Sequence, residues 1–297
     1  LVSGCHDRLT VRVIELTAAR HHLPAVDWCW MAFGSEGRGE QTFVTDQDNG
    51  LVFSAADARE AEALRAVFLP FAEECNRHLA DCGFTLCPGR IMAGNPACCL
   101  SFEEWRTQFI EWIRRPEPTA LLNASIFFDL RPLFGQAALV EELRTLLLAV
   151  SSDTPSFQHL MAANALQAEV PLGFLGELAG DGQQRLDLKK FGSRIFVDAA
   201  RIFALASGCT AVNTSERLCQ AGRAAGMSAA EIAAVNSAFS HILRVRLTGQ
   251  CADRSDAAPG SHGIRIDTLH DMDRAILKES LKQARRLQQR LKLNYAL

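Results

Sequence analysis

The segment 34–49 holds the residues whose types and spacing best suit chemistry on a phosphate group. Gly34 and Gly37 allow the backbone to approach a ligand closely, because neither carries a Cβ atom. Ser35 adds a hydroxyl group, and the successive backbone N–H groups of such a turn can surround an anion. Arg38 supplies a planar guanidinium that matches phosphate oxygens. The front of this segment therefore predicts a phosphate-binding turn.

Two carboxylates, Asp46 and Asp48, follow two residues apart. On an extended chain such residues point to the same face, where their charges repel each other unless a cation lies between them. Mg²⁺ prefers one or two carboxylates together with substrate phosphates. Two such ions stabilise the attacking and leaving oxygens of a displacement at phosphorus. That reaction usually uses a third carboxylate, and Asp129, at the end of a predicted strand over residues 124–129, is the best candidate.

A plainer interpretation exists for each of these acids taken singly. Asp is typical of turns and helix caps, because its side chain bonds nearby backbone N–H groups. Asp46 and Asp48 would then be loop residues near a turn, and Asp129 would be a helix cap before Arg131 and Pro132. The combination of a buried strand, a Gly-Ser turn, an Asp-x-Asp pair and a later Asp favours the catalytic interpretation.

The cysteines offer a second candidate cluster, for zinc. The spacing of its members fits no standard zinc-ligand pattern; they are Cys75, His78, Cys82 and Cys87. The chain has ten cysteines and no C-x-x-C pair, and most lie in apolar stretches where a thiol behaves as a small hydrophobe. We therefore expect core cysteines in a reducing, cytoplasmic compartment.

The first half of the chain alternates strand and helix patterns around these residues. A nearly unbroken apolar run at 26–33 predicts a buried strand immediately before the glycine-rich segment. Ser101 and Glu104 form a capping-box pattern that opens a helix. The remaining elements expected in this half are helices over 7–22 and 56–80 and short strands at 51–53 and 124–129.

After about residue 135 the strand patterns stop. Ser228 with Glu231, and Thr268 with Asp271, resemble further helix caps. The helices expected are 138–150, 156–168, 193–207, 215–225, 229–247 and 269–293. We predict an α+β protein, in which a small mixed-sheet domain over residues 1–137 precedes an all-helical bundle over residues 138–297.

Composition narrows the function classes. Hydrophobic residues make up 48% of the chain and charged residues 22%, which is typical of globular proteins. Residues 1–150 hold 13 Lys and Arg against 20 Asp and Glu, whereas residues 151–297 hold 18 against 14. Neither half is basic enough for non-specific nucleic-acid binding. No apolar run approaches the roughly 18 residues of a membrane span, and no signal-peptide pattern opens the chain.

The pair Gly34-Ser35, followed by Asp46-x-Asp48, resembles the signature of the DNA polymerase beta-type nucleotidyltransferase superfamily. The string GSEGRGEQTFVTDQDNG is similar to a narrower group of bacterial nucleotidyltransferases. These usually accompany cyclic-nucleotide-binding and CBS domains and resemble the N-terminal part of the uridylyltransferase that modifies the PII signalling protein. The resemblance continues at residues 90–96, 126–131, 187–192 and 213–218 and in the final helix.

This resemblance implies a role for each matching residue. Gly34 and Ser35 would hold the triphosphate of an NTP, and Arg38 would contact phosphate. Asp46, Asp48 and Asp129 would be the catalytic, metal-binding carboxylates for two Mg²⁺ ions, with Mn²⁺ as an alternative. The helical domain would add Lys189, Lys190 and Arg194 as nucleotide contacts, unless these are solvated charges at the start of a helix. Glu40 either orients Arg38 or closes the turn, and Asn95 has either a turn or a substrate role.

The sequence therefore predicts a transferase that moves NMP from an NTP to a hydroxyl acceptor on a protein or a small molecule, in signal transduction. The alternative is a non-catalytic nucleotide-binding sensor. Neither the base of the NTP nor the acceptor is encoded in a motif. The regulatory cyclic-nucleotide-binding and CBS domains lie outside this sequence, which opens at Leu1. We therefore interpret it as a fragment or a shortened member of that group.

Overall fold

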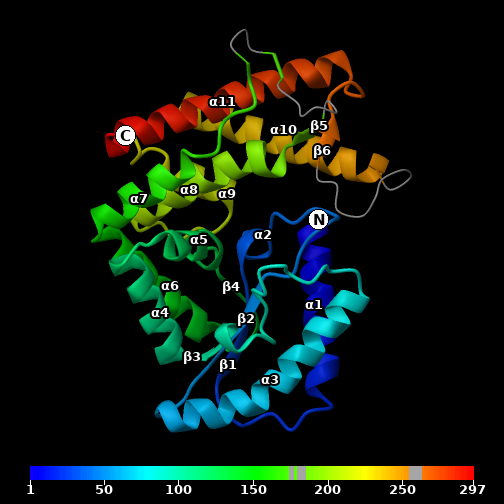
Figure 1. Ribbon diagram of the computed structural model, residues 1–297, viewed down its shortest axis with the longest axis vertical. Coiled ribbons are helices and arrows are strands. Elements are labelled where there is room, and N and C mark those ends of the chain that lie inside the picture. Colours follow the sequence, from blue (N-terminus) through cyan, green and yellow to red (C-terminus); the bar gives the residue numbers. More distant parts are fainter. Residues whose placement is uncertain (174–176, 179–184, 254–262) are drawn as a thin grey trace. The chain divides into compact units, whose positions relative to one another are not determined.

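The computed structural model describes residues 1–173, 177–178, 185–253 and 263–297, and Figure 1 labels its elements. Contacts divide the chain into two units, Leu1–Asp153 and Thr154–Leu297. In chain order, the elements of the first unit are α1 (Val2–Ala18), β1 (Trp28–Ala32), α2 (Gly34–Gly37), β2 (Asn49–Phe53), α3 (Ala58–Asp81), η1 (Pro96–Cys98), β3 (Cys99–Ser101), α4 (Phe102–Arg114), α5 (Pro118–Phe127), β4 (Arg131–Gly135) and α6 (Ala137–Ser152).

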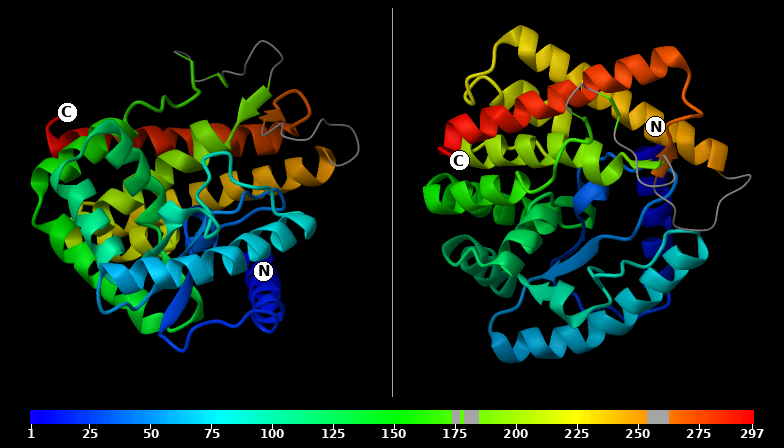
Figure 2. Two further views of the ribbon diagram at one scale, coloured as in Figure 1. Left: turned by 60° about the horizontal axis from the view of Figure 1, so that its bottom comes forward. Right: turned by 45° about the horizontal axis from the view of Figure 1, so that its top comes forward.

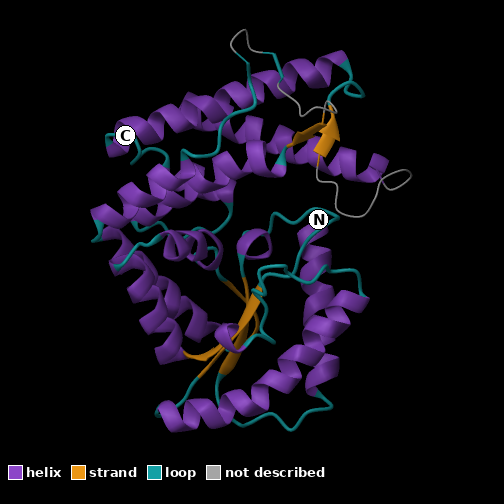
Figure 3. Ribbon diagram, viewed as in Figure 1, coloured by secondary structure: helices purple, strands orange, loops and turns teal. Residues whose placement is uncertain are grey.

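A four-stranded mixed sheet, ordered β3-β2-β1-β4, forms the centre of the first unit (orange in Figure 3). β1 runs antiparallel to both β2 and β4, whereas β2 and β3 are parallel. Ala32, the last residue of β1, lies opposite Asn49 in β2 and Arg131 in β4. The turn after β1, the chain before β2 and the chain before β4 therefore meet at one end of the sheet.

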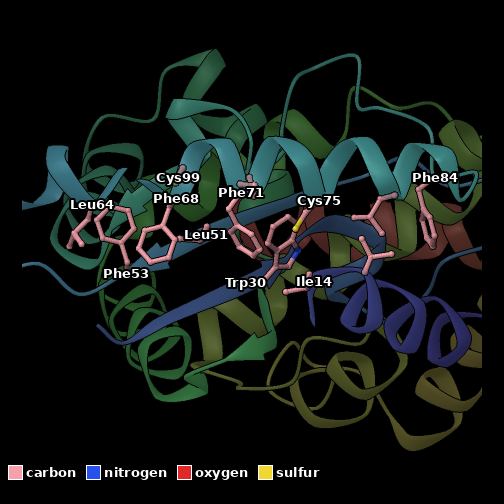
Figure 4. Packing of buried hydrophobic residues seen from close by; sticks show 14 of the residues in the cluster. Ile14, Trp30, Leu51, Phe53, Leu64, Phe68, Phe71, Cys75, Phe84 and Cys99 are labelled. Atoms are coloured by element: carbon pink, nitrogen blue, oxygen red, sulfur yellow. The ribbon is translucent and has the colours of Figure 1, made fainter. Parts of the chain in front are cut away.

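Both faces of this sheet are covered. Every residue of β2 is buried, which requires cover on both sides. α3 lies over one face, where Phe68, Phe71 and Cys75 pack toward Trp30 and the aromatic ring of Phe53 (Figure 4). α4 and α6 contact β2, and α6 also contacts β1. The positions of the strand ends are thus fixed by a closely packed core on both faces of the sheet and do not depend on the loops.

The first unit extends to α6, one helix beyond the boundary that the sequence suggested after residue 137. α6 contacts α4, β4 and β1. Its buried residues Val140, Leu143 and Leu147 recur at helical spacing and form the face that makes this contact. This apolar face explains why the helix stays with the sheet.

The strand predicted at residues 124–129 is wrong. Most of that segment belongs to α5, which opens with Pro118 at its first turn, and Asp129 follows the helix just before β4. A short apolar run does not distinguish a buried helix from a buried strand. β4 was missed because Pro132 and Gly135 interrupt it; both are tolerated there since β4 is an edge strand.

The second unit is mainly helical, and α11 runs along α10 and α8 (Figure 2). Its elements are α7 (Pro155–Ala165), β5 (Arg185–Asp187), the π-helical turn η2 (Lys189–Ser193), α8 (Arg194–Ser207), α9 (Thr214–Ala221), α10 (Ala229–Asp253), β6 (Gly263–Arg265) and α11 (Asp271–Tyr295). The six helices predicted after residue 137 are present, the first of them as α6 in the first unit and the other five in this unit. The expectation of no further strands is wrong, because β5 and β6 form an antiparallel pair.

The predicted caps of this unit have different outcomes. The cap at Ser228 is confirmed: Glu231 N donates to Ser228 Oγ at 3.2 Å, and Ser228 N donates to Glu231 Oε2 at 2.7 Å. The cap at Thr268 is wrong, because its hydroxyl donates to Arg265 O and His270 precedes the helix instead.

The α+β fold class is confirmed by the small mixed sheet and the helical second unit. No helix of the described chain combines the length and apolar character that a bilayer crossing needs.

Candidate functional site

The short helical turn α2 follows β1 and packs against two acid-bearing segments. Gly34 has φ +53°, a left-handed conformation that favours glycine, and a Cβ atom there would stand 3.0 Å from Asp48 Oδ2. A Cβ at Gly37 would stand 1.8 Å from the backbone oxygen of Asp129. The two glycines therefore bring the backbone of α2 against Asp48 on one side and Asp129 on the other.

Asp46 and Asp48 lie on one face of an extended chain, as their spacing predicts. Gln47 and Asn49 between and beside them are buried, with 1% of each residue exposed, whereas the two Asp residues are half-buried. Asp46 forms an isolated parallel bridge with Thr85. Phe33 N donates to Asp48 O at 2.8 Å, which attaches this chain to the start of α2.

A buried amide network holds the opposite face of this extended chain, and sequence reasoning missed it. Asn76 of α3 donates through Nδ2 to Gln47 Oε1 and to Asn49 Oδ1, each at 2.9 Å. Gln47 Nε2 donates to the backbone oxygens of Asn76 and Phe84. Ala93 N donates to Asn49 Oδ1 at 2.8 Å. In the sequence, the sign of this network was the alternation of amide residues with the two acids. Buried amides require hydrogen-bond partners, so such an alternation indicates a bonded, buried face.

Asp129 is fully buried and paired with Arg38. Arg38 Nη1 donates to Asp129 Oδ2 at 2.5 Å, and Arg38 Nε donates to Glu40 Oε2 at 2.8 Å. Both roles left open for Glu40 have a contact in the structure, because Glu40 N also donates to Ser35 O at 2.9 Å and so closes the turn. A buried carboxylate needs a charged or hydrogen-bonded partner, and Arg38 supplies both to Asp129.

Glu36 is a buried acid inside α2 that the sequence analysis did not select. Burial raises the pKa of Glu36 to about 8; the charges of Asp7 and Asp48 act in the same direction, whereas Arg131 opposes them. Arg131 Nη2 donates to Asp7 Oδ1 at 2.9 Å and to Glu36 O at 3.0 Å. Arg131 thus ties α1 and β4 to the turn.

Cys87 is a further neighbour of Asp48. Burial raises the pKa of the Cys87 thiol, and the nearby charge of Asp48 acts in the same direction.

Within the described ranges, no group of three or more His, Cys, Asp and Glu side chains could form a metal site by itself. The proposed zinc cluster is therefore not assembled; Cys75 packs in the hydrophobic core, where burial raises the pKa of its thiol to about 12.

Magnesium differs from zinc because it needs only one or two protein carboxylates. Asp46 and Asp48 meet that requirement, since both lie half-buried on one face. Because Gly34 has no Cβ, the Asp48 carboxylate lies close against the backbone of α2. Two carboxylates, with hard oxygen ligands, beside a glycine-containing turn fit Mg²⁺.

The three basic residues selected in the helical half, Lys189, Lys190 and Arg194, lie together in the second unit at η2 and the start of α8. Asp187 Oδ1 accepts from the backbone N–H groups of Lys189 and Lys190 at 2.9 and 3.0 Å. Arg194 Nε donates to Asp198 Oδ2 at 3.2 Å. A π-helical turn of this kind is frequent at functional sites.

More basic side chains surround that turn. Arg201 is almost fully buried and donates to Asp198 Oδ1 at 2.7 Å. Arg246 of α10 donates to Ser193 Oγ at 3.0 Å. Asp198 therefore accepts hydrogen bonds from two arginines, Arg194 and Arg201. The described side chains around η2 carry more positive than negative charge. Sequence reasoning missed Arg201 and Arg246, because they come from the interior of two helices.

Comparison with known families gives two matches. Residues 1–119 match the family described as Putative nucleotidyltransferase DUF294, and residues 155–295 match its companion, the Putative nucleotidyltransferase substrate binding domain. The first range holds α2, Asp46 and Asp48, the second holds η2, and Asp129 lies between the two. No curated protein matches the chain. Because the two matches together span most of its length, the chain belongs to a nucleotidyltransferase-type family.

Proposed function

We propose that this protein transfers a nucleoside monophosphate from an NTP to a hydroxyl acceptor, with Mg²⁺ as cofactor and pyrophosphate as the leaving group. The observation that carries the proposal is the convergence of α2, Asp48 and Asp129 at one end of the sheet. The acceptor oxygen forms a bond to the α-phosphorus, and the bond to the β-phosphate oxygen breaks. We place the reaction in the cytoplasm, in keeping with ten free thiols.

In this proposal Asp46 and Asp48 hold the cation. When bound, Mg²⁺ neutralises phosphate charge and stabilises the attacking and leaving oxygens; Mn²⁺ would suit the same oxygen ligands. The protein's own contribution is positioning. The amide network under Gln47 and Asn49 fixes the direction of both carboxylates before substrate binds.

The turn α2 is proposed to hold the triphosphate through its backbone N–H groups and the Ser35 hydroxyl. Asp129 is the proposed third carboxylate, which accepts the proton of the acceptor hydroxyl. Its Oδ2 is held by Arg38, so the side chain is oriented and its charge is compensated. Arg38 acts on phosphate only through the part of its guanidinium that faces away from Asp129 and Glu40.

We propose Lys189, Lys190 and Arg194 of the second unit as nucleotide contacts. Support comes from the net positive charge around η2 and from the description of the matching family as a substrate binding domain. Guanidinium and ammonium groups bind phosphate oxygens through charge-assisted hydrogen bonds.

A second candidate is a nucleotide sensor without catalysis. It is favoured by one observation: Asp129 is fully buried and already bonded to Arg38. If that pair does not open, the third carboxylate cannot reach a substrate, and the protein would bind NTP without turnover.

Nucleotidyl transfer is tested by incubating the protein with each NTP labelled at the α-phosphate, and measuring pyrophosphate release and labelled acceptor in a cell extract. We expect metal-dependent release with one NTP. Asp48→Asn should abolish it, while Asp27→Asn should retain it, because Asp27 is exposed and precedes β1 at the end of that strand away from α2. Binding without release supports the sensor instead. Equal release by Asp48→Asn and wild type contradicts the assignment of Asp48.

A further inference from the structure

A pocket of about 360 Å³ lies in the first unit, between the C-terminal half of α3 and residues 86–95. Its floor is apolar and includes Ala80, Leu86 and Met92. Leu86 is 50% exposed and adds apolar surface to this pocket. The volume lies within the range of small-molecule sites, about 300–1,000 Å³.

Charged side chains of both signs surround this floor. Arg77 and Arg90 are exposed, and neither guanidinium has an ion-pair or hydrogen-bond partner among the residues that the structure describes. Glu73 and Asp81 also line the pocket, and Asp81 lies 3.7 Å from His78. The four side chains balance in charge. A polyanion such as a triphosphate would be repelled by the two acids, so the pocket does not suit a second NTP.

Arg90 stands in a backbone conformation that an L-residue rarely adopts. Its φ is +56°, and its carbonyl accepts a hydrogen bond from Asn95 Nδ2 at 2.8 Å, which closes the loop. Glycine would fit this conformation without strain. An arginine in such a position is an outlier that points to use of its side chain.

We propose that this pocket binds a small zwitterion with an apolar body, of the amino-acid or dipeptide class. Its carboxylate would pair with Arg77 and Arg90, since a guanidinium matches a carboxylate through two parallel hydrogen bonds. Its ammonium group would pair with Glu73, and its apolar side chain would cover Leu86 and Met92. A ligand with one charge of each sign matches the two signs of charge that line the pocket.

The pocket borders the candidate site through shared residues. Asn76 and Gly94 line it, and Gly94 N donates to Asn76 Oδ1 at 2.8 Å. The same Asn76 side chain holds Gln47 and Asn49 beside the two acids. A bound zwitterion therefore acts as an effector of the carboxylates; this step rests on the proposed function, whereas binding itself does not.

Binding is tested with ligand-observed NMR on the full chain. The probes are L-leucine and L-methionine, with 4-methylpentanoate and 3-methylbutylamine as analogues that carry one charge each. We expect saturable binding of the amino acids and none of the analogues. Arg90→Gly, which keeps the left-handed backbone, and Arg77→Gln should each weaken binding about tenfold. Arg59→Gln, on the same helix outside the pocket, should not.

Three outcomes overturn the zwitterion proposal: no binding of either amino acid up to its solubility limit, equal binding of the carboxylate-only analogue, or binding unchanged in both arginine variants. The effector step has a separate readout. Saturating amino acid should change the dissociation constant of the Mg²⁺–NTP complex at least twofold, and no change removes that step alone. Failure of NTP binding in every condition bears on the proposed function and leaves the amino-acid result standing.

Discussion

The Asp48 carboxylate occupies the space that a side chain on residue 34 would need. A Cβ atom on Gly34 would lie 3.0 Å from Asp48 Oδ2, closer than such atoms ordinarily approach. This close approach joins two motifs that are separated along the sequence, the candidate phosphate-binding turn and the candidate metal ligand. This relationship makes Gly34 a test of the site as well as of the backbone.

Gly34→Ala is expected to lose both stability and nucleotide binding. The left-handed backbone at φ +53° costs an alanine about 1–2 kcal/mol, and the new methyl group displaces the Asp48 carboxylate. Gly39→Ala is the matched control, because Gly39 has φ +66° and open space around it. Chemical denaturation should give similar losses for both variants, whereas nucleotide titration should show a defect in Gly34→Ala alone. Equal nucleotide affinity in the two variants would refute the close-approach argument.

Glu36 should make the first unit less stable as the pH rises. Its pKa is about 8 in the folded chain and near 4.5 when unfolded, so between these values the folded state keeps a proton that the unfolded state has lost. Stability therefore falls through this window, by up to about 1.4 kcal/mol per pH unit, and is constant outside it. Glu36→Gln removes the dependence.

The measurement is the free energy of unfolding of Glu36→Gln minus that of wild type, taken from pH 4 to pH 9. The difference should increase with pH and level off above about pH 8. A flat difference for Glu36→Gln would mean that Glu36 is ionised in the folded chain.

Removal of Arg38 should destabilise the first unit strongly. Asp129 is fully buried, and Arg38→Ala leaves its carboxylate without its guanidinium, a loss of about 3–5 kcal/mol for a buried pair. Arg12→Ala breaks only an exposed pair with Glu15 and should change stability by less than about 1 kcal/mol. Urea denaturation compares the two. A small effect at Arg38 would indicate that Asp129 is neutral or otherwise partnered.

The buried amide of Asn76 should matter both for folding and for the two acids. Asn76→Ala removes the donor to Gln47 and Asn49 and the acceptor for Gly94 N, at a cost of about 2–4 kcal/mol. Asn123→Ala on α5 should be close to neutral. At temperatures where the variant is folded, its Mg²⁺-dependent NTP affinity should be reduced, as isothermal titration would show. Unchanged affinity would mean that the carboxylates do not depend on the network for their direction.

The parts of this fold that the sequence predicted are those with local patterns. Periodicity located the helices, and Gly34, Asp46 and Asp48 belong to one short segment whose spacing carries their relation. Asp129 lies against α2 but follows a helix instead of ending the strand that the sequence suggested, because an apolar run suits a helix as well as a strand.

The parts that could not be predicted depend on contacts between distant residues. Arg38 meets Asp129 across 91 positions, and Asn76 meets Gln47 across 29. No local preference encodes such pairs; they follow from the antiparallel pairing of β1 with β2 and β4. The surroundings of the buried Glu36 were hidden for a similar reason, since Asp7 of α1 and Arg131 of β4 are distant from it in the sequence.

The central claim is most directly tested by the thermal stability of the wild type and Asp46→Asn with each of the four NTPs, in the presence and absence of Mg²⁺. A ligand at 100 times its dissociation constant adds about 2.7 kcal/mol, which gives a measurable rise in Tm. We predict a rise for one NTP that requires Mg²⁺ and disappears in Asp46→Asn, while Asp27→Asn behaves as wild type. No rise with any NTP, or an equal rise in Asp46→Asn, would contradict the assignment of this site to metal-dependent nucleotide binding.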